Sequence, residues 1–295
     1  ASVEDALAPP TLGAELDVKH LNRESITAAT TAQVAELGGA GINVNATTLI
    51  DTGTQYRAEQ GTAQIDAESH HFAAAHDTTT ESVNRLDVET GVRVDTTTGS
   101  DINLRLSGKG GSLQSEALNH LARPGSLYGQ SGIQIQLGSD GLYEGTQFNA
   151  GNGALKVLAG GDLSLAQAND RQQKSLKQLE GNAWAKGGNN PLGNVLEARG
   201  YLERNLNNST DTQARVAAID AVGDVQLQAG GKLELAGTRI GSAAAKVDNI
   251  DLQSTGKLLV SAAIDTHQAQ GSKLDGGLEL LGKSSATGKG GALGG

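Results

Sequence analysis

The sequence predicts an all-β solenoid, in which short strands are wound into stacked coils. Three observations support this: landmarks recur every 91 or 92 residues, apolar residues alternate with polar ones, and glycine is abundant at 41 of 295 residues. Only seven residues are aromatic. A globular core usually relies on aromatic rings for much of its buried area. This chain must therefore bury small aliphatic side chains in many thin layers.

The long internal period is the strongest of these signals. Gly-Thr-Gln precedes Tyr56 and again Phe148, and Gly-Thr-Arg precedes Ile240, at intervals of 92 residues. The glycines at 41, 132 and 223, which lie ahead of these tripeptides, are 91 residues apart. Two independent landmarks with one period favour true repetition, and a period this long contains several stacked units.

The repeat predicts how the chain is divided. We expect one module at 41–131, a second at 132–222, and an incomplete third at 223–295, with 1–40 as the tail of a preceding module. The sequence begins with Ala1 rather than Met, and both ends cut across the repeat. We therefore expect an internal segment of a longer protein.

Shorter echoes within the modules predict the strands. The pattern Ala-Gly-Gly-x-Leu-x-Leu occurs at 159–165 and 229–235, and a related Ser-Thr-Gly-Lys-Leu-Leu-Val occurs at 254–260. Each is a turn of small residues, one charged residue and then a strand. Alternation at Val225, Leu227 and Ala229 turns one strand face inward and leaves Gln226 and Gln228 in water. Such short strands bury a face only when coils stack.

Polar stretches interrupt the coils at matching places. We expect the segments 76–109 and 169–186 to project from the solenoid, and 265–273 to be a third such excursion, leading toward Lys289. The second could be helical from the spacing of its leucines, although Gly200 weakens that reading. The solenoid itself should form a rod several times longer than it is wide.

Composition excludes several classes of function. The chain has no cysteine, which excludes disulfides, thiolate metal sites and cysteine nucleophiles. Its net charge of −10 opposes binding to nucleic acid, which needs Lys and Arg on phosphates. No apolar run approaches the ~18 residues of a membrane-spanning segment.

One literal nucleotide-binding string needs explanation. Residues 277–284, GLELLGKS, match the phosphate-loop pattern GxxxxGK[ST]. A working loop has small residues that cradle phosphate and then opens a helix. Here the interior is Leu-Glu-Leu-Leu, and the glycine-rich residues 285–295 favour no helix. We expect no nucleotide binding, and an ATP-binding role is the weakest alternative.

No other constellation predicts catalysis. His70, His71 and His76 lie near carboxylates, but adjacent residues on a strand point to opposite faces, so we expect rung or surface histidines rather than a metal site. Trp184 could stack on sugars, although a single Trp is more often a packing anchor. We predict no catalytic, cofactor-binding or metal-binding residues and no cofactor, and hence no enzyme.

Together these features resemble the haemagglutinin repeat region of filamentous-haemagglutinin-type exoproteins, the two-partner-secreted adhesins and contact-dependent growth-inhibition effectors of Gram-negative bacteria. The resemblance rests on the turns at 159–165 and 229–235, the polar Thr78–Ser82 and the glycine-rich stretches near Lys109 and Lys289. It implies a right-handed parallel β-helix. The secretion-domain motif Asn-Pro-Asn-Gly and the pretoxin motif Val-Glu-Asn-Asn do not occur in the sequence.

The expected function is therefore structural. The resemblance implies a repeat segment of a secreted bacterial surface fibre, acting as an adhesin or as the stalk of a contact-dependent toxin-delivery protein. It also implies two partners: an outer-membrane secretion transporter, and a receptor or glycan on the target cell. The alternative is a β-helix enzyme that degrades polysaccharide, which would need a solvent-facing cluster of carboxylates on one side of the solenoid.

Overall fold

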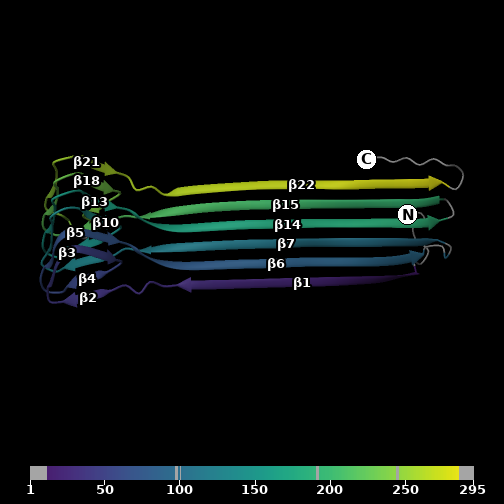
Figure 1. The fold of residues 1–295 in the computed structure, drawn as a ribbon, viewed down its shortest axis with the longest axis horizontal. Helices are drawn as coiled ribbons and strands as arrows, with labels where there is room; N and C mark the ends of the chain where they lie inside the picture. The colour runs from purple at the N-terminus through teal and green to yellow at the C-terminus, as the bar shows by residue number, and fades with distance from the viewer. Residues whose placement is uncertain (1–11, 97–98, 100, 191–192, 244–245, 286–295) are drawn as a thin grey trace, which may run out of the picture.

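The computed structural model describes residues 12–96, 99, 101–190, 193–243 and 246–285. All regular elements in these residues are strands, β1 to β22, and none is a helix. The strands form two structures, a coiled solenoid at one end and a long flat sheet that leaves it sideways (Figure 1). The predicted all-β parallel β-helix is confirmed.

Parallel strands make up the walls of the solenoid. One sheet of six strands has the order β19-β16-β11-β8-β4-β2. Its strands are β2 (Glu36–Gly39), β4 (Gln55–Ala58), β8 (Ser126–Gly129), β11 (Gln147–Asn149), β16 (Ala218–Asp220) and β19 (Arg239–Ile240). Every pair in it is parallel and in register, as in a solenoid that adds one strand per coil.

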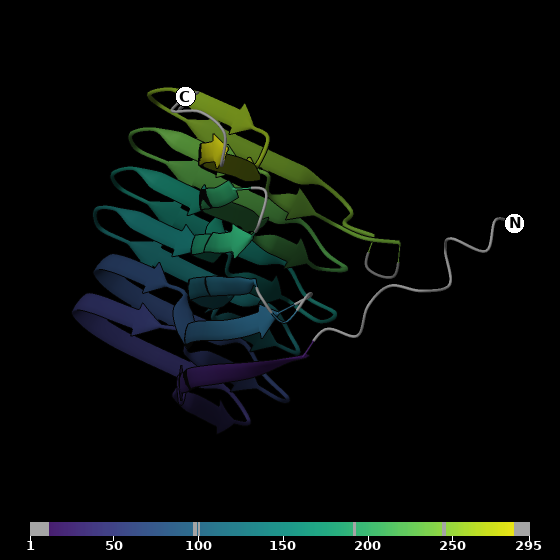
Figure 2. The same cartoon turned by 90° about the vertical axis from the view of Figure 1, so that its right-hand side faces the viewer.

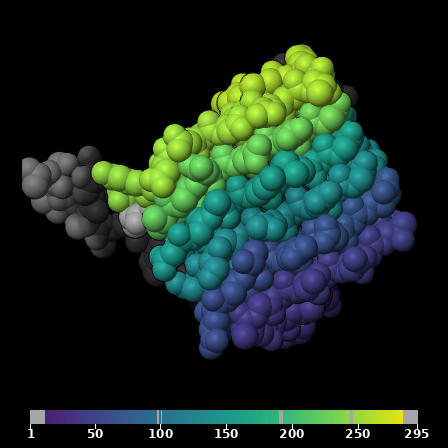
Figure 3. All heavy atoms as spheres, turned by 90° about the vertical axis from the view of Figure 1, so that its left-hand side faces the viewer, coloured from purple at the N-terminus to yellow at the C-terminus, as the bar shows by residue number. Residues whose placement is uncertain are grey.

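A second parallel sheet provides the other walls. Its strands are β3 (Ile42–Thr52), β5 (Ala63–Ala73), β9 (Ile133–Leu137), β10 (Gly141–Glu144), β12 (Leu155–Ala159), β13 (Leu163–Ala166), β17 (Val225–Ala229), β18 (Leu233–Ala236), β20 (Ile250–Ser254) and β21 (Leu258–Ser261). The long strand β5 joins the two walls, because its first half pairs with β9 and its second half with β10. Figure 3 shows the coils as parallel bands running from purple to yellow.

The core consists of ladders of aliphatic side chains along the solenoid axis. Ile65, Ile135, Val157, Leu227 and Leu252 are direct register partners on successive coils. The first four are at most 1% exposed. The predicted alternation is confirmed, because Val225 and Leu227 are buried while Gln228 is exposed. The turn repeats also coincide, since Ala159 pairs with Ala229, and Leu163 with Leu233.

The recurring Gly-Thr motif marks one corner of the coil. Gly53, Gly145 and Gly237 all have positive φ, at 65°, 61° and 62°. This left-handed conformation favours glycine over residues with a Cβ atom. A Cβ on Gly145 would lie 2.8 Å from the carbonyl oxygen of Arg215. The backbone conformation of this corner therefore explains why the motif recurs.

Replacement of Gly145 by alanine is expected to destabilise the solenoid by roughly 1–3 kcal/mol, the usual cost of a non-glycine residue in this conformation. The measurement is the midpoint of chemical unfolding. Gly38→Ala is the matched control, because no atom lies within 4 Å of a Cβ placed there. Equal midpoints for the two variants would contradict this account.

The polar excursions form strands, and they extend further than predicted. Of the first excursion, residues 76–96 lie in β6 (Ala75–Thr96) and 102–109 in β7 (Ile102–Arg123), while 169–186 lie in β14 (Ala168–Asn190), which pairs with β15 (Gly193–Arg215). The helical interpretation of the second excursion is wrong, because its backbone bonds to the neighbouring strands β7 and β15. That these segments project from the solenoid is confirmed (Figure 1).

The expected rod shape needs correction. A wall of six strands at ~4.8 Å spacing gives a solenoid only about 25–30 Å long. A strand of 22 residues at ~3.3 Å per residue spans roughly 70 Å. The longest dimension of this segment therefore runs along the lateral sheet, perpendicular to the solenoid axis (Figure 1).

Candidate functional site: the two faces of the long sheet

Six antiparallel strands form the lateral sheet in the order β1-β6-β7-β14-β15-β22. The edge strands are β1 (Leu12–Thr30) and β22 (Thr266–Ser285). The sheet is a single layer, and its hairpins β6–β7 and β14–β15 both return to the solenoid (Figure 1). Because successive residues of a strand point to opposite faces, each strand contributes side chains to both exposed faces.

One face is mainly apolar over the half of the sheet that lies far from the solenoid, with His20, Thr90 and Arg204 as polar exceptions. The register places on it Leu12, Ala14, Leu16 and Val18 of β1, Leu86, Val88, Val92 and Val94 of β6, Ile102, Leu104 and Leu106 of β7, Leu179, Ala183 and Ala185 of β14, Leu196, Ala198 and Leu202 of β15, and Leu274, Leu278 and Leu280 of β22. We call this set the apolar area. Its large side chains are all about 40% exposed or more.

The half of the same face nearest the solenoid is mainly polar. Thr78, Thr80 and Ser82 of β6 lie there, with Gln114 of β7 and Gln268 of β22, although Ile26, Leu118 and Leu206 lie there too. The change from mainly polar to mainly apolar therefore occurs along most strands at about the same distance from the solenoid. The sheet is divided by chemistry into an inner and an outer half.

The opposite face of the outer half is charged. Glu89 of β6 lies between two lysines, with Lys19 Nζ at 3.4 Å and Lys109 Nζ at 3.1 Å. The hydrogen bond from Lys109 lowers the pKa of the Glu89 carboxyl. Arg199 also pairs with Glu279 at 2.6 Å, and Lys273 with Glu203 at 2.9 Å. These exposed pairs each contribute little to stability, so they define the surface rather than the fold.

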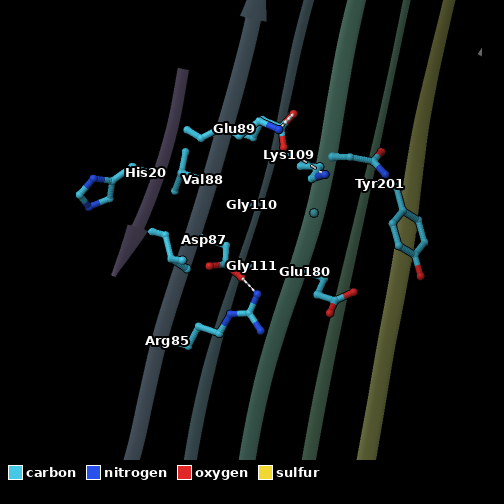
Figure 4. A pocket seen from close by; sticks show the side chains of 14 residues that line it. His20, Arg85, Asp87, Val88, Glu89, Lys109, Gly110, Gly111, Glu180 and Tyr201 are labelled. Atoms are coloured by element: carbon cyan, nitrogen blue, oxygen red, sulfur yellow. Dashed lines mark ion pairs between the residues drawn. The ribbon is translucent and has the colours of Figure 1, made fainter. Parts of the chain in front are cut away.

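A hollow of about 510 Å³ opens on this charged face. Gly111 leaves space there because it has no side chain on this face, and Gly110 and Gly181 line the hollow with their backbone. Figure 4 shows the Lys109–Glu89 pair on one side of the hollow and the Arg85–Asp87 pair on another, with Glu180 and Tyr201 around it. The hollow offers donors and acceptors of both signs, which suits a polar partner.

Trp184 lies on the charged face between two arginines. The guanidinium carbons of Arg105 and Arg199 are 5.6 and 5.8 Å from its ring. These cation–π contacts make Trp184 a packing anchor for the side chains around it. On the apolar face, by contrast, a groove of about 470 Å³ runs between Leu106 and Leu280, with Ala183 and Ala185 among its lining residues.

A second polar cluster is buried inside the solenoid. His70 is 1% exposed, and its Nε2 lies 2.9 Å from Asp51 Oδ2 while its Nδ1 lies 3.1 Å from the Tyr143 hydroxyl. The Tyr56 hydroxyl donates to Asp51 at 2.9 Å. Burial raises the pKa of the Asp51 carboxyl, but the hydrogen bonds from His70, Tyr56 and Thr54 outweigh burial and leave it lowered. Burial also raises the pKa of Tyr143.

The predicted histidines take the expected positions. His70 occupies a rung position, stacked between Leu49 and Gly141, while His71 points outward and is exposed. His76 lies in β6 near His120, with ring centroids 6.4 Å apart. Within the described ranges no group of three or more His, Asp or Glu side chains is arranged to hold a metal ion.

The nucleotide-like string lies in an extended strand. Residues 277–284 belong to β22, whose register with β15 runs without interruption. Residues 286–295, with Lys289, lie outside the described residues. Among the residues that are described, no helix is long and apolar enough to cross a membrane.

Sequence reasoning missed the two-faced sheet. The signal was present as i, i+2 alternation at Leu86, Val88, Val92 and Val94, and again at Ile102, Leu104 and Leu106. It was hidden because the second faces of these strands carry so many charges that the segments read as polar. Only the pairing of six such strands places their apolar residues on one surface.

The fold and this surface define a solenoid repeat protein with a lateral sheet. A family model described as hemagglutinin repeat matches residues 16–183 and 144–276. The chain belongs to this hemagglutinin repeat family. It is 32% identical over 275 residues to a protein named hemolysin from Serratia marcescens, and 28% identical over 274 residues to a hemolysin from Proteus mirabilis.

These alignments cover 93% and 92% of this chain but 17% of each relative. The chain thus corresponds to about one sixth of the length of these relatives. No solved structure matches the chain. The family and the relatives identify a secreted or cell-surface protein of Gram-negative bacteria, and the family suggests a structural or adhesive role rather than catalysis.

Proposed function

We propose that the chain is a repeat segment of a large secreted surface fibre, in which the solenoid is the spine and the lateral sheet meets the target cell. One observation carries this: the aliphatic core lies in the solenoid, while the sheet extends roughly 70 Å from it with both faces exposed. A surface that contributes so little to the core is free to carry recognition. The partner would be a receptor or a glycan.

The charged face is the part of the sheet that suits such a partner. Its hollow presents Lys109, Glu180 and Tyr201 together, and paired charges give specificity more than affinity. In this proposal the inner ladders act only on stability, and the outer half of the sheet acts on binding. The full-length protein would reach the cell surface through an outer-membrane secretion transporter of the two-partner type.

Two versions of the fibre are open to it, an adhesin or the stalk of a toxin-delivery protein. The name of both relatives, hemolysin, supports a full-length protein that acts on host cells.

We also propose the module boundaries 41–131, 132–222 and 223–295. They are supported by the spacing of the coils: Ile42, Ile133 and Val225 occupy every second coil of one wall. A hairpin follows each of the first two pairs of coils, and β22 follows the third pair.

Removing the outer half of the sheet should abolish cell binding and leave the solenoid folded. Arg85 pairs with Leu113, and Gln178 with Asn205, in the same row across the sheet. Replacing 86–112 and 179–204 each by Asn-Gly, with the chain trimmed to 23–273, shortens all six strands at that row and closes both hairpins with favoured turns. We expect the melting temperature of the solenoid to stay nearly unchanged and binding to erythrocytes to fall to background.

Two outcomes of that experiment would contradict the proposal. If the shortened protein loses its parallel β-structure, the outer half is part of the fold. If flow cytometry shows unchanged cell binding, the outer half is a spacer, and recognition lies elsewhere. A full-length Lys109→Gln variant is compared with the shortened protein in the same binding assay. It breaks the ion pair between Lys109 and Glu89 but leaves all six strands at full length.

A further inference from the structure

The apolar area is organised around one row that crosses the whole sheet. Six residues, one from each strand, stand directly opposite one another in this row: Leu16, Val92, Leu106, Ala185, Ala198 and Leu280. All six are apolar. The four large ones are between 41% and 65% exposed. An uninterrupted apolar row across six strands forms a continuous apolar surface, which differs from the single exposed apolar residues found on most proteins.

The extent of this area demands a partner. Eleven residues per strand at ~3.3 Å and six strands at ~4.8 Å give about 1,000 Å² of flat surface. Contiguous apolar patches on monomeric proteins rarely exceed a few hundred Å². The inner half of the face is polar, so the demand is confined to the outer half. The charged face on the other side of the sheet does not need to be covered by a partner.

We propose that the apolar area packs face to face against the apolar area of a second copy of this chain. Two sheets stacked at ~10 Å, with their strands within about 30° of each other, form a dry β-sandwich. The contact would bury about 2,000 Å² in total, which matches stable protein interfaces. A surface that meets its own equivalent satisfies the symmetry of a two-fold dimer. This inference is independent of the proposed cell-binding function.

The solenoid fixes the relative direction of the two copies. It extends beyond the plane of the sheet on both sides (Figure 2). Two copies pointing the same way would therefore collide at their solenoids before their sheets could meet. The copies must point in opposite directions and overlap only by their outer halves, which are the halves that are apolar. Both charged faces then remain on the outside.

The chemistry around the area favours a second copy over a lipid surface. The aromatic rings of the outer half, Trp184 and Tyr201, both lie on the charged face, whereas proteins that bind membranes place such rings at the edge of the apolar surface. At the tip the apolar face ends in neutral Thr96, Asn189 and Asn194. On the charged face Asp and Glu are about as numerous as Lys and Arg, so this face has no excess of positive charge to attract anionic lipid.

Sedimentation equilibrium of the whole chain, from about 1 to about 100 μM, tests the proposal. We expect a dimer. Val92→Glu combined with Leu106→Glu places two carboxylates in the centre of the contact and should raise the dissociation constant roughly 100-fold or more. The matched control, Ser107→Glu with Asn182→Glu, adds the same charge to the opposite face and should dimerise like the parent. Far-UV circular dichroism checks that both variants fold.

A cross-linking experiment locates the contact. Because the chain has no cysteine, Ala185→Cys gives a single thiol in the middle row, while Ser107→Cys gives one on the charged face. A short bismaleimide should link only Ala185→Cys into dimers. A monomer at every concentration, or a dimer that the glutamates at 92 and 106 leave unchanged, would overturn the proposal. So would a monomer that floats with phosphatidylcholine vesicles and loses flotation on Val92→Glu, which would identify lipid as the occupant.

Discussion

Replacing Leu227 by alanine is expected to lower the free energy of unfolding of the solenoid by about 2–5 kcal/mol, the usual cost of emptying a fully buried leucine site. Leu227 is 0% exposed and stands between Val157 and Leu252 on the neighbouring coils. The rigid backbone ladders on both sides prevent the coils from closing the cavity. Chemical denaturation followed by circular dichroism measures the change.

Leu121→Ala is the matched control for this substitution. Leu121 lies in β7 on the charged face, close to the solenoid, and is 52% exposed. The same change of side chain should there cost well under 1 kcal/mol, since surface substitutions usually have small effects. Comparable losses at the two positions would mean that the lateral sheet, and not the solenoid, carries the stability.

Replacing Asp51 by alanine should destabilise the solenoid by about 2–5 kcal/mol, because it leaves two buried polar groups without their partner. The Tyr56 hydroxyl and His70 Nε2 both lie 2.9 Å from the Asp51 carboxylate. Burial makes each lost hydrogen bond costly, because His70 and Tyr56 are almost fully buried. The denaturation midpoint at neutral pH gives the size of the effect.

The contribution of Asp51 should depend on pH with a definite sign. Its pKa is lowered in the folded protein, against about 4 in the unfolded chain. Its stabilising contribution is therefore complete above about pH 4 to 5 and is lost as the pH falls through the lowered folded pKa. Asp51→Asn cannot ionise. The difference in stability between the parent and Asp51→Asn should be constant near neutrality and shrink in acid; a difference that grows in acid would refute this assignment.

We therefore expect the solenoid to determine the stability of the molecule and the outer half of the sheet to determine its association. Leu227 and Asp51 act within coils that satisfy their own packing and hydrogen bonding. Val92 and Leu106, in contrast, are exposed in a single layer whose apolar face requires a second surface. Substitutions in the solenoid should change stability, whereas substitutions in the outer half of the sheet should change association.

The sequence alone determined the solenoid, its turns and the residues of its core. The 92-residue spacing of the Gly-Thr motif, the turn at Ala159–Leu165 and the alternation at Val225 and Leu227 are local patterns, and each has one satisfactory structural solution. Local patterns suffice there because each coil repeats the same contacts with its neighbours. For the same reason strand alternation predicts that His70 and His71 point to opposite faces, whereas the structure shows that His70 is the inward one.

Only the tertiary structure decided what the polar excursions become. Leu86, Leu179 and Leu274 lie far apart in the sequence and share one face because four strand registers align them. A shift of one residue in any of those registers would send the apolar residues of a strand to the charged face. Between the hairpins, the register is set by pairing of residues about 50 to 90 positions apart in the sequence, and no local pattern contains it. The spine of this protein is thus determined by the sequence of each coil, while its surface is decided by how distant strands align.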